Sequence, residues 1–125
     1  MNQFFKRTAL CLTLAFGATS VLALPADFDA KMAARPDADK ARDEARKPKE
    51  TVELLGIQEG WTVVDVSAGG GWFTRVLSAA VGPNGKVLAQ FGERPLQTNN
   101  GQAQKDMAAS LGNVEPQFVA MSGVA

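Results

Sequence analysis

The pattern of hydrophobic and polar positions divides the chain into an apolar start, a charged stretch and a series of short alternating elements. Residues 8–23 carry no charge, whereas residues 27–50 are highly charged and poor in large apolar groups. Beyond Gly56, β-branched runs alternate with segments whose apolar positions recur at helical spacing. The pattern therefore predicts three regions, which span residues 1–23, 24–56 and 57–125.

The third region is expected to alternate strands and helices. The predicted strands span residues 61–66, 86–91 and 114–121, the predicted helices 72–80 and 103–111, and a polar loop 92–102. This β–α–β–α–β order is typical of a parallel sheet with right-handed crossovers. In the first helix the apolar positions fall on one face, so we expect that face, Trp72 and Phe73 included, to enter the core.

The second region predicts helices with mixed charges. Pro36 suits the first position of a helix, because its missing N–H costs nothing there. The segment Asp37–Lys47 is rich in helix formers, and Pro48 interrupts it. A second helix over Lys49–Leu55 is expected to end at Gly56 in the left-handed conformation. Two interpretations stay open: a solvated, mixed-charge helix or a lid over a ligand site.

The first region has the three parts of a secretory signal peptide. Lys6 and Arg7 form a positive start, an apolar run follows, and Val21 and Ala23 suit a cleavage site after Ala23. A membrane anchor is the alternative, but a spanning helix needs roughly 20 apolar residues and this run has 16. We therefore expect a periplasmic or secreted protein that is not attached to a membrane after cleavage.

Composition narrows the function classes. Cleavage would remove Lys6, Arg7 and the single cysteine, Cys11, leaving 11 basic against 13 acidic residues. That balance gives no electrostatic footprint for nucleic acid. Since the chain has no histidine and the mature part no cysteine, we expect neither disulfides nor a zinc-type metal site.

The most informative segment is the turn from Asp65 to Gly71, where a predicted strand passes into a helix. Free main-chain N–H groups at such a junction attract polar ligand groups, and glycines let a ligand approach the backbone. The dinucleotide pattern G-x-G-x-x-G would require glycine at position 74 or 72, which are Thr74 and Trp72. A nucleotide-dependent dehydrogenase is therefore disfavoured.

The same turn resembles the D-x-G-x-G-x-G motif of class I S-adenosylmethionine methyltransferases. It reads Asp65-Val66-Ser67-Ala68-Gly69-Gly70-Gly71, with serine at the first glycine position. The lead-in from Arg35 to Pro48 resembles a group of exported bacterial predicted methyltransferases. The resemblance covers residues 33–121, the N-terminal half of the family fold. It implies an α/β, Rossmann-like three-layer sandwich truncated to about three of seven strands, whose first strand is an exposed edge.

The resemblance implies which residues hold S-adenosylmethionine. Gly69 and Gly71 would let the turn pass beneath the methionine and ribose parts of the cofactor, and Asp65 would orient the loop and accept hydrogen bonds from the amino end. Ser67 is tolerated if its backbone conformation is ordinary. The implied cofactor-binding residues are Asp65, Ser67, Ala68, Gly69, Gly70, Gly71 and Gln90.

Gln90 belongs to this set because of a departure from the family pattern. The family places an acidic residue at the end of the second strand, where it grips the ribose hydroxyls. Here that position is Phe91, while Gln90 before it can accept one hydrogen bond and Glu93 follows two residues later. The end of the second strand is thus the least typical part of the predicted cofactor site.

Two functions follow from these observations. The first is the cofactor-binding half of an exported S-adenosylmethionine-dependent methyltransferase, which we expect to be inactive alone. The second is a non-catalytic periplasmic binding or interaction protein that retains the fold, favoured by Phe91 and by export away from the cytoplasmic supply of cofactor. The sequence identifies neither a catalytic residue nor the methyl acceptor, and it leaves the oligomeric state open.

Overall fold

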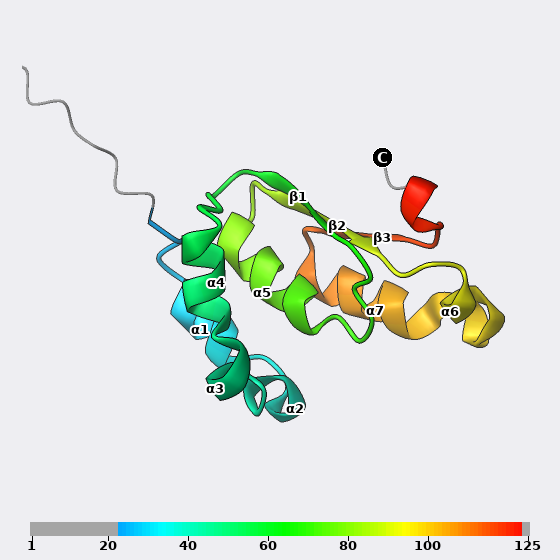
Figure 1. Ribbon diagram of the computed structural model, residues 1–125, viewed down its shortest axis with the longest axis horizontal. Helices are drawn as coiled ribbons and strands as arrows, with labels where there is room; N and C mark the ends of the chain where they lie inside the picture. Colours follow the sequence, from blue (N-terminus) through cyan, green and yellow to red (C-terminus); the bar gives the residue numbers. More distant parts are fainter. Residues whose placement is uncertain (1–22, 124–125) are drawn as a thin grey trace, which may run out of the picture.

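The computed structural model describes residues 23–123, so the predicted signal peptide lies outside the described residues except for Ala23. Four short helices precede an alternating series of strands and helices (Figure 1). The elements are α1 (Phe28–Ala33), α2 (Asp37–Lys40), α3 (Asp43–Arg46), α4 (Pro48–Leu54), β1 (Thr62–Asp65), α5 (Trp72–Val81), β2 (Lys86–Gln90), α6 (Arg94–Gln97), η1 (Asn99–Gly101), α7 (Gln102–Leu111), β3 (Val114–Gln117) and η2 (Met121–Gly123).

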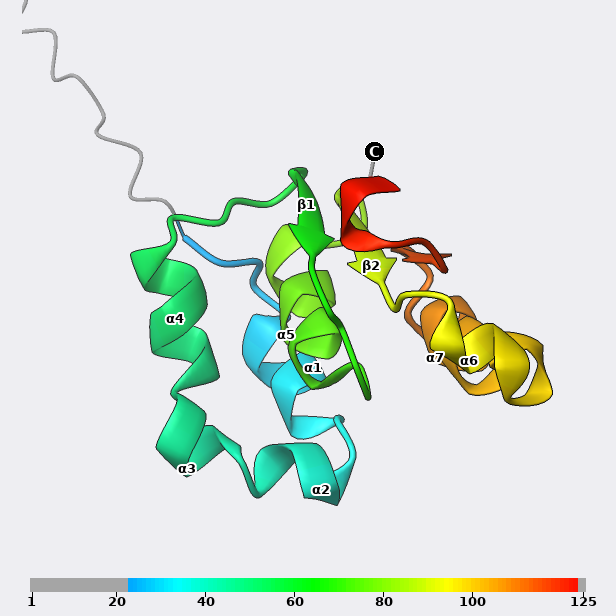
Figure 2. The same ribbon diagram turned by 45° about the vertical axis from the view of Figure 1, so that its right-hand side comes forward.

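The three strands form one parallel sheet in the order β1-β2-β3. Val63 pairs with Val87 in the first ladder, and Ala89 pairs with Pro116 in the second. Helices α5 and α7 lie on the same face of this sheet (Figures 1 and 2). The α/β class and the parallel, Rossmann-like sheet are therefore confirmed, with three strands among residues 23–123.

Strand β1 forms an edge of the described sheet. Val63 and Asp65 face α5, whereas Val64 on the opposite face is 44% exposed and Val66, just beyond the strand, 52% exposed. Trp61, which precedes the strand, is also 44% exposed. The expected apolar edge is thus present, and such an edge favours pairing with another strand.

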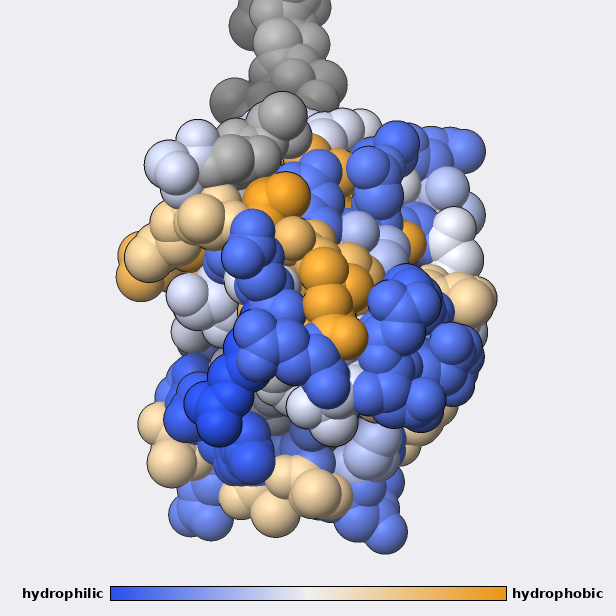
Figure 3. All heavy atoms as spheres, turned by 90° about the vertical axis from the view of Figure 1, so that its right-hand side faces the viewer, coloured by the Kyte–Doolittle hydropathy of each residue, from blue (hydrophilic) through white to orange (hydrophobic). Residues whose placement is uncertain are grey.

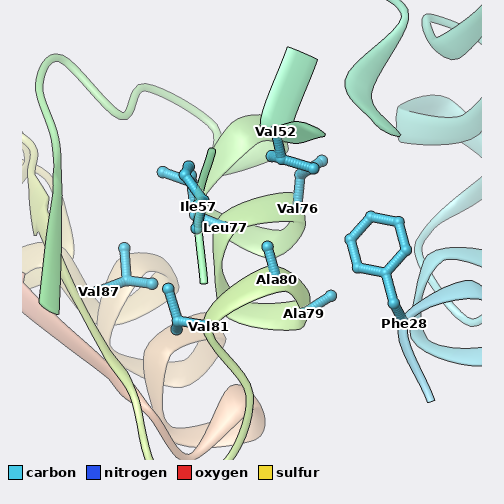
Figure 4. Close-up of a cluster of buried hydrophobic side chains, with 9 residues drawn as sticks. All are labelled: Phe28, Val52, Ile57, Val76, Leu77, Ala79, Ala80, Val81 and Val87. Atoms are coloured by element: carbon cyan, nitrogen blue, oxygen red, sulfur yellow. The ribbon is translucent and has the colours of Figure 1, made fainter. Parts of the chain in front are cut away.

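The core is built around α5, which is buried on nearly all sides. Its apolar side chains meet the sheet on one flank and the N-terminal helices on the other (Figure 4). The buried cluster consists of Phe28, Val52, Ile57, Val76, Leu77, Ala79, Ala80, Val81 and Val87. Because α1 and α4 contribute Phe28 and Val52 to it, the charged lead-in is part of the folded unit.

The first of these helices, α1, was not predicted. Its segment is charged, and two apolar side chains pack it against the core: Phe28, which is 2% exposed, and the half-buried Met32. Lys49 bridges α4 to α1 through an ion pair with Asp29 at 2.8 Å. One pair of apolar positions in a charged segment is too little periodicity to reveal a helix from sequence, so this element depends on tertiary packing.

The predicted helix over residues 37–47 is instead two short helices, α2 and α3. The carbonyl of Asp39 accepts the Arg42 N–H at 3.0 Å in an i→i+3 arrangement and also accepts the Trp72 indole N–H at 3.0 Å. This shared acceptor sits where the α-helical pattern stops. Lys47 then adopts a left-handed conformation with φ of 46° before Pro48 begins α4.

Other boundaries differ in smaller ways. The predicted polar loop 92–102 contains α6 and η1, and β3 ends at Gln117 rather than at residue 121. Gly56 has a φ of +64°, as expected for the end of α4. The side of the molecule that carries α6 and β3 is mostly hydrophilic, with a narrow hydrophobic strip across it (Figure 3). Within residues 23–123, no helix is long and apolar enough to cross a membrane.

The position of Phe28 gives a stability prediction. Replacing it in Phe28→Ala leaves a cavity between α1 and α5, which typically costs about 3–5 kcal/mol for a buried aromatic ring. The free energy of unfolding, measured by urea denaturation, should fall by that amount. Leu54→Ala is the matched control, because Leu54 lies on α4 but is 89% exposed, and should change stability by less than about 0.5 kcal/mol. Equal losses in both variants would contradict the packing described.

Candidate functional site

The glycine-rich turn between β1 and α5 is a tight bend with an open outer side. Ser67, Gly69 and Gly71 all have left-handed backbones, with φ of 57°, 57° and 78°. A Cβ added at Gly70 would meet no atom within 4 Å, and one at Gly69 only the Ser67 carbonyl oxygen at 3.8 Å. The main chain at Gly69 and Gly70 is therefore accessible to a ligand.

Gly71 is needed for a different reason. A Cβ there would lie 2.8 Å from the Met107 Cε of α7, so the side chain of Met107 covers this residue. Gly71 is buried, and its left-handed φ ends the turn at the N-cap of α5. Of the two glycines expected beneath a cofactor, only Gly69 has free space above it.

Ser67 does not have the ordinary backbone conformation on which its fit to the motif depended. Its φ of 57° is in the left-handed region, which non-glycine residues seldom adopt. The conformation is held by hydrogen bonds to the end of β2. The Ser67 N–H donates to the Oε1 of Gln90 at 2.8 Å, and the Ala68 N–H donates to the Gln90 carbonyl at 2.8 Å.

Gln90 is consequently a residue that positions the loop. Its side chain is 3% exposed, and its Nε2 donates to the carbonyl of Val119 at 2.6 Å. Both ends of the amide are hydrogen-bonded to main-chain groups. One partner follows β1 and the other follows β3, the two strands that flank β2. The sequence pointed to Gln90 as a ligand acceptor, but its contacts show a link between the glycine turn and the segment after β3.

Asp65 ends β1 and is buried, with 8% of its surface exposed. Its Oδ2 accepts a hydrogen bond from the Thr74 Oγ1 at 2.5 Å. Burial raises the pKa of the Asp65 carboxyl above its usual value, and the hydrogen bond from Thr74 opposes that rise. No other hydrogen bond from the described residues reaches this carboxyl, so one oxygen remains free to accept from a ligand.

Two depressions border the turn, and a third lies near them at the end of β2. A shallow, open cavity of about 450 Å³ lies beside Asp65 and is lined by Arg46, Thr51, Asp65, Val66, Ser67, Trp72 and Phe73. A smaller one of about 160 Å³ is lined by Gly69, Gly70, Arg75, Ala103, Gln104 and Met107. A third, of about 400 Å³, is lined by Phe91, Arg94, Pro95, Thr98, Asn99, Ala103 and Gln104.

The third depression includes the position where the resemblance implies a carboxylate. Phe91 is half-buried there, and its ring centroid lies 5.8 Å from that of Phe118 after β3. Glu93 is exposed at the start of α6 and does not line this depression. The end of β2 thus offers an aromatic face rather than an acid.

The charged lead-in contacts this site directly, which the sequence did not reveal. Asp39 of α2 forms an ion pair with Arg75 at 3.0 Å, and the same Arg75 nitrogen donates to the Gly70 carbonyl at 3.1 Å. The indole N–H of Trp72 donates to the Asp39 carbonyl. Trp72 therefore faces the lead-in instead of the core, whereas Phe73 packs against the core.

The contacts of Asp39 with Trp72 and Arg75 join residues 33 and 36 positions apart in the sequence, and no local pattern marks such partners. The only sequence signal was the mixed charge of residues 37–47, which suits solvent as well as a partner. Asp39 is 8% exposed, whereas most of its neighbours in α2 and α3 are exposed. Within residues 23–123, no group of three or more His, Cys, Asp or Glu side chains could hold a metal ion.

Comparison with models of known protein families found no match, and comparison with curated proteins found none either. Among solved structures, the fold is similar to a SAM-dependent methyltransferase from Aquifex aeolicus, with a TM-score of 0.53 and 28% sequence identity. The match covers 74% of this chain and 46% of that chain, so this chain spans less than half of that protein. The fold is thus methyltransferase-like.

The buried carboxyl of Asp65 predicts a pH effect. The pKa of Asp65 in the folded protein lies above the ordinary value of 3.8. The protonated carboxyl therefore contributes its full stabilisation only below pH 3.8, and this contribution is lost as the pH rises through the raised pKa. Asp65→Asn cannot ionise and still accepts from Thr74. The free energy of unfolding of this variant minus that of the wild type, measured in urea from pH 3 to 7, should therefore increase as the pH rises.

Asp37→Asn is the control for this measurement. The pKa of Asp37 is lowered, chiefly by a hydrogen bond from Lys40, so its carboxylate stabilises the fold above the ordinary pKa and loses that effect as the pH falls. The free energy of unfolding of the control variant minus that of the wild type should therefore decrease as the pH rises, which is the opposite of the change expected for Asp65→Asn. A constant difference between Asp65→Asn and wild type would contradict the buried carboxyl.

The ion pair between lead-in and turn predicts a second stability effect. Asp39→Asn removes the charge that faces Arg75, whose side chain is 19% exposed. We expect a loss of roughly 2 kcal/mol, between the values typical of exposed and buried pairs. Urea denaturation measures it, with Asp37→Asn on the same helix as control because its side chain is 97% exposed. Similar small losses in both would mean that the pair contributes little.

Proposed function

We propose that this protein is the cofactor-binding half of an S-adenosylmethionine-dependent methyltransferase that is exported to the periplasm or secreted. The observation that carries the proposal is the open main chain at Gly69 and Gly70, directly after the buried Asp65 at the carboxyl end of β1. The similar methyltransferase from Aquifex aeolicus supports it by fold. Export rests on the pattern of residues 1–23.

The residues of the turn suit the chemical groups of such a cofactor. Asp65 has a carboxyl oxygen free of protein hydrogen bonds that can accept from an ammonium group. A side chain at Gly69 or Gly70 would occupy open space, so glycine leaves a cradle for the nucleoside. Gln90 fixes the bend through Ser67 and Ala68. When bound, the cofactor would supply an electrophilic methyl group on a sulfonium.

Methyl transfer also requires a positioned acceptor, and positioning alone can supply much of the rate. None of the depressions around the turn carries a second set of groups that would define an acceptor or a base. We therefore assign cofactor binding to this chain and expect no methyl transfer from it alone. The methyl acceptor is not assigned.

A non-catalytic binding or interaction protein with the same fold is the second candidate. Two observations favour it. Phe91 stands where a carboxylate would hold the ribose, and the Gln90 amide beside it is engaged by the Ser67 N–H and the Val119 carbonyl. A ribose at this end of β2 would find an aromatic face but no acid.

Isothermal titration with S-adenosylhomocysteine separates the two candidates. We expect micromolar binding by the purified protein. Asp65→Ala should abolish it by removing the ammonium acceptor, and Gly69→Val should abolish it by filling the open side of the turn. Gly112→Val is the matched control, because Gly112 also has a positive φ, of 79°, and open space, but it ends α7 away from the turn.

Each outcome has a distinct meaning. Binding that survives in Gly112→Val and is lost in Gly69→Val attributes the loss to the turn rather than to backbone strain. Equal loss of S-adenosylhomocysteine binding in Gly69→Val and Gly112→Val would contradict a binding role for the turn. A folded wild-type protein that gives no heat with the ligand would overturn the methyltransferase proposal and favour the interaction protein.

A further inference from the structure

The cavity beside Asp65 brings together one acidic and one basic side chain. Arg46 from α3 and Asp65 from β1 both line it, together with the hydroxyl-bearing Thr51 and Ser67. The two charged groups come from segments 19 positions apart in the chain. Its volume, about 450 Å³, is enough for part of a small molecule. A site with one charge of each sign suits a ligand that also carries both charges.

Arg46 is held at this cavity by the ring of Trp72. Its guanidinium carbon lies 5.1 Å from the centroid of the Trp72 ring, a cation–π arrangement. Trp72 is fixed in turn by its hydrogen bond to the Asp39 carbonyl. Helix α3 is fixed by an ion pair between Arg35 and Asp43. The lead-in is therefore anchored at two points that set where Arg46 stands.

The charge of Arg46 is not neutralised by the protein. Arg35 and Arg75 each form an ion pair with an aspartate, whereas Arg46 has no acidic partner within 4 Å among the described residues. Its planar guanidinium presents paired N–H donors that match a carboxylate. Asp65, which lines the same cavity, keeps one oxygen free of hydrogen bonds from the described residues.

We propose that Arg46 binds the carboxylate of the amino-acid portion of the cofactor, while Asp65 binds its ammonium group. This inference rests on the proposed function, because it assigns a residue to the same ligand. It gives the charged lead-in a direct role in binding and places the amino-acid end in the cavity beside β1. The nucleoside end would then extend past Gly69 and Gly70.

The test compares two ligands and two variants by isothermal titration. S-adenosylhomocysteine carries the amino-acid portion, whereas 5′-methylthioadenosine has the nucleoside and sulfur without it. In Arg46→Gln, the dissociation constant of S-adenosylhomocysteine should rise about tenfold, as for loss of a charge-assisted hydrogen bond, while that of 5′-methylthioadenosine stays unchanged. Arg42→Gln is the control, because Arg42 is exposed on the same lead-in and does not line the cavity; it should change neither.

Raised salt supplies a second measurement, because charges that are partly exposed are screened. The wild-type affinity for S-adenosylhomocysteine should fall with ionic strength more steeply than that of Arg46→Gln. Equal affinity of wild type and Arg46→Gln for S-adenosylhomocysteine would overturn the inference. Weakened binding of both ligands would also overturn it, because Arg46 would then act on the turn as a whole. Wild-type protein that binds neither ligand would instead refute the proposed function.

Discussion

The burial of α5 between the sheet and the N-terminal helices is the constraint on which the rest of the structure depends. Val76, Ala80 and Val81 are fully buried, so α5 is covered on nearly all sides. The sheet alone would cover only one side of the helix. Phe28 and Val52 cover the other, and they therefore bring a charged, otherwise soluble segment into the fold. A chain of this size gains much of its buried apolar area in this way.

That packing also places the groups around the glycine turn. Because the lead-in lies against α5, Asp39 reaches both Trp72 and Arg75 in the first turn of that helix. Arg75 in turn donates a hydrogen bond to the Gly70 carbonyl. From the sheet side, Gln90 holds Ser67 and Ala68. The turn is thus fixed from two directions while its outer side stays open, which suits a binding site formed before the ligand arrives.

Two arginines near the turn are paired with aspartates, whereas Arg46 is not paired among the described residues. Arg35 with Asp43 and Arg75 with Asp39 are neutralised within the lead-in and its contacts. Arg46 has no such partner among the described residues, and it faces the same cavity as Asp65. The unpaired cation and the buried acid make the beginning of the turn the most polar part of the site. The end of β2, with Phe91 and Phe118, is the most apolar part.

The sequence by itself determined the alternation of the three strands with the two long helices, the parallel sheet and the position of the glycine turn, because these follow from local periodicity and from glycines next to an acid. Only the tertiary structure decided what holds the turn. The helix α1, the break at Asp39 and the reach of Gln90 to Ser67 all arise from contacts between distant segments. A side chain such as Gln90 has one identity in the sequence but many possible partners, and packing selects among them.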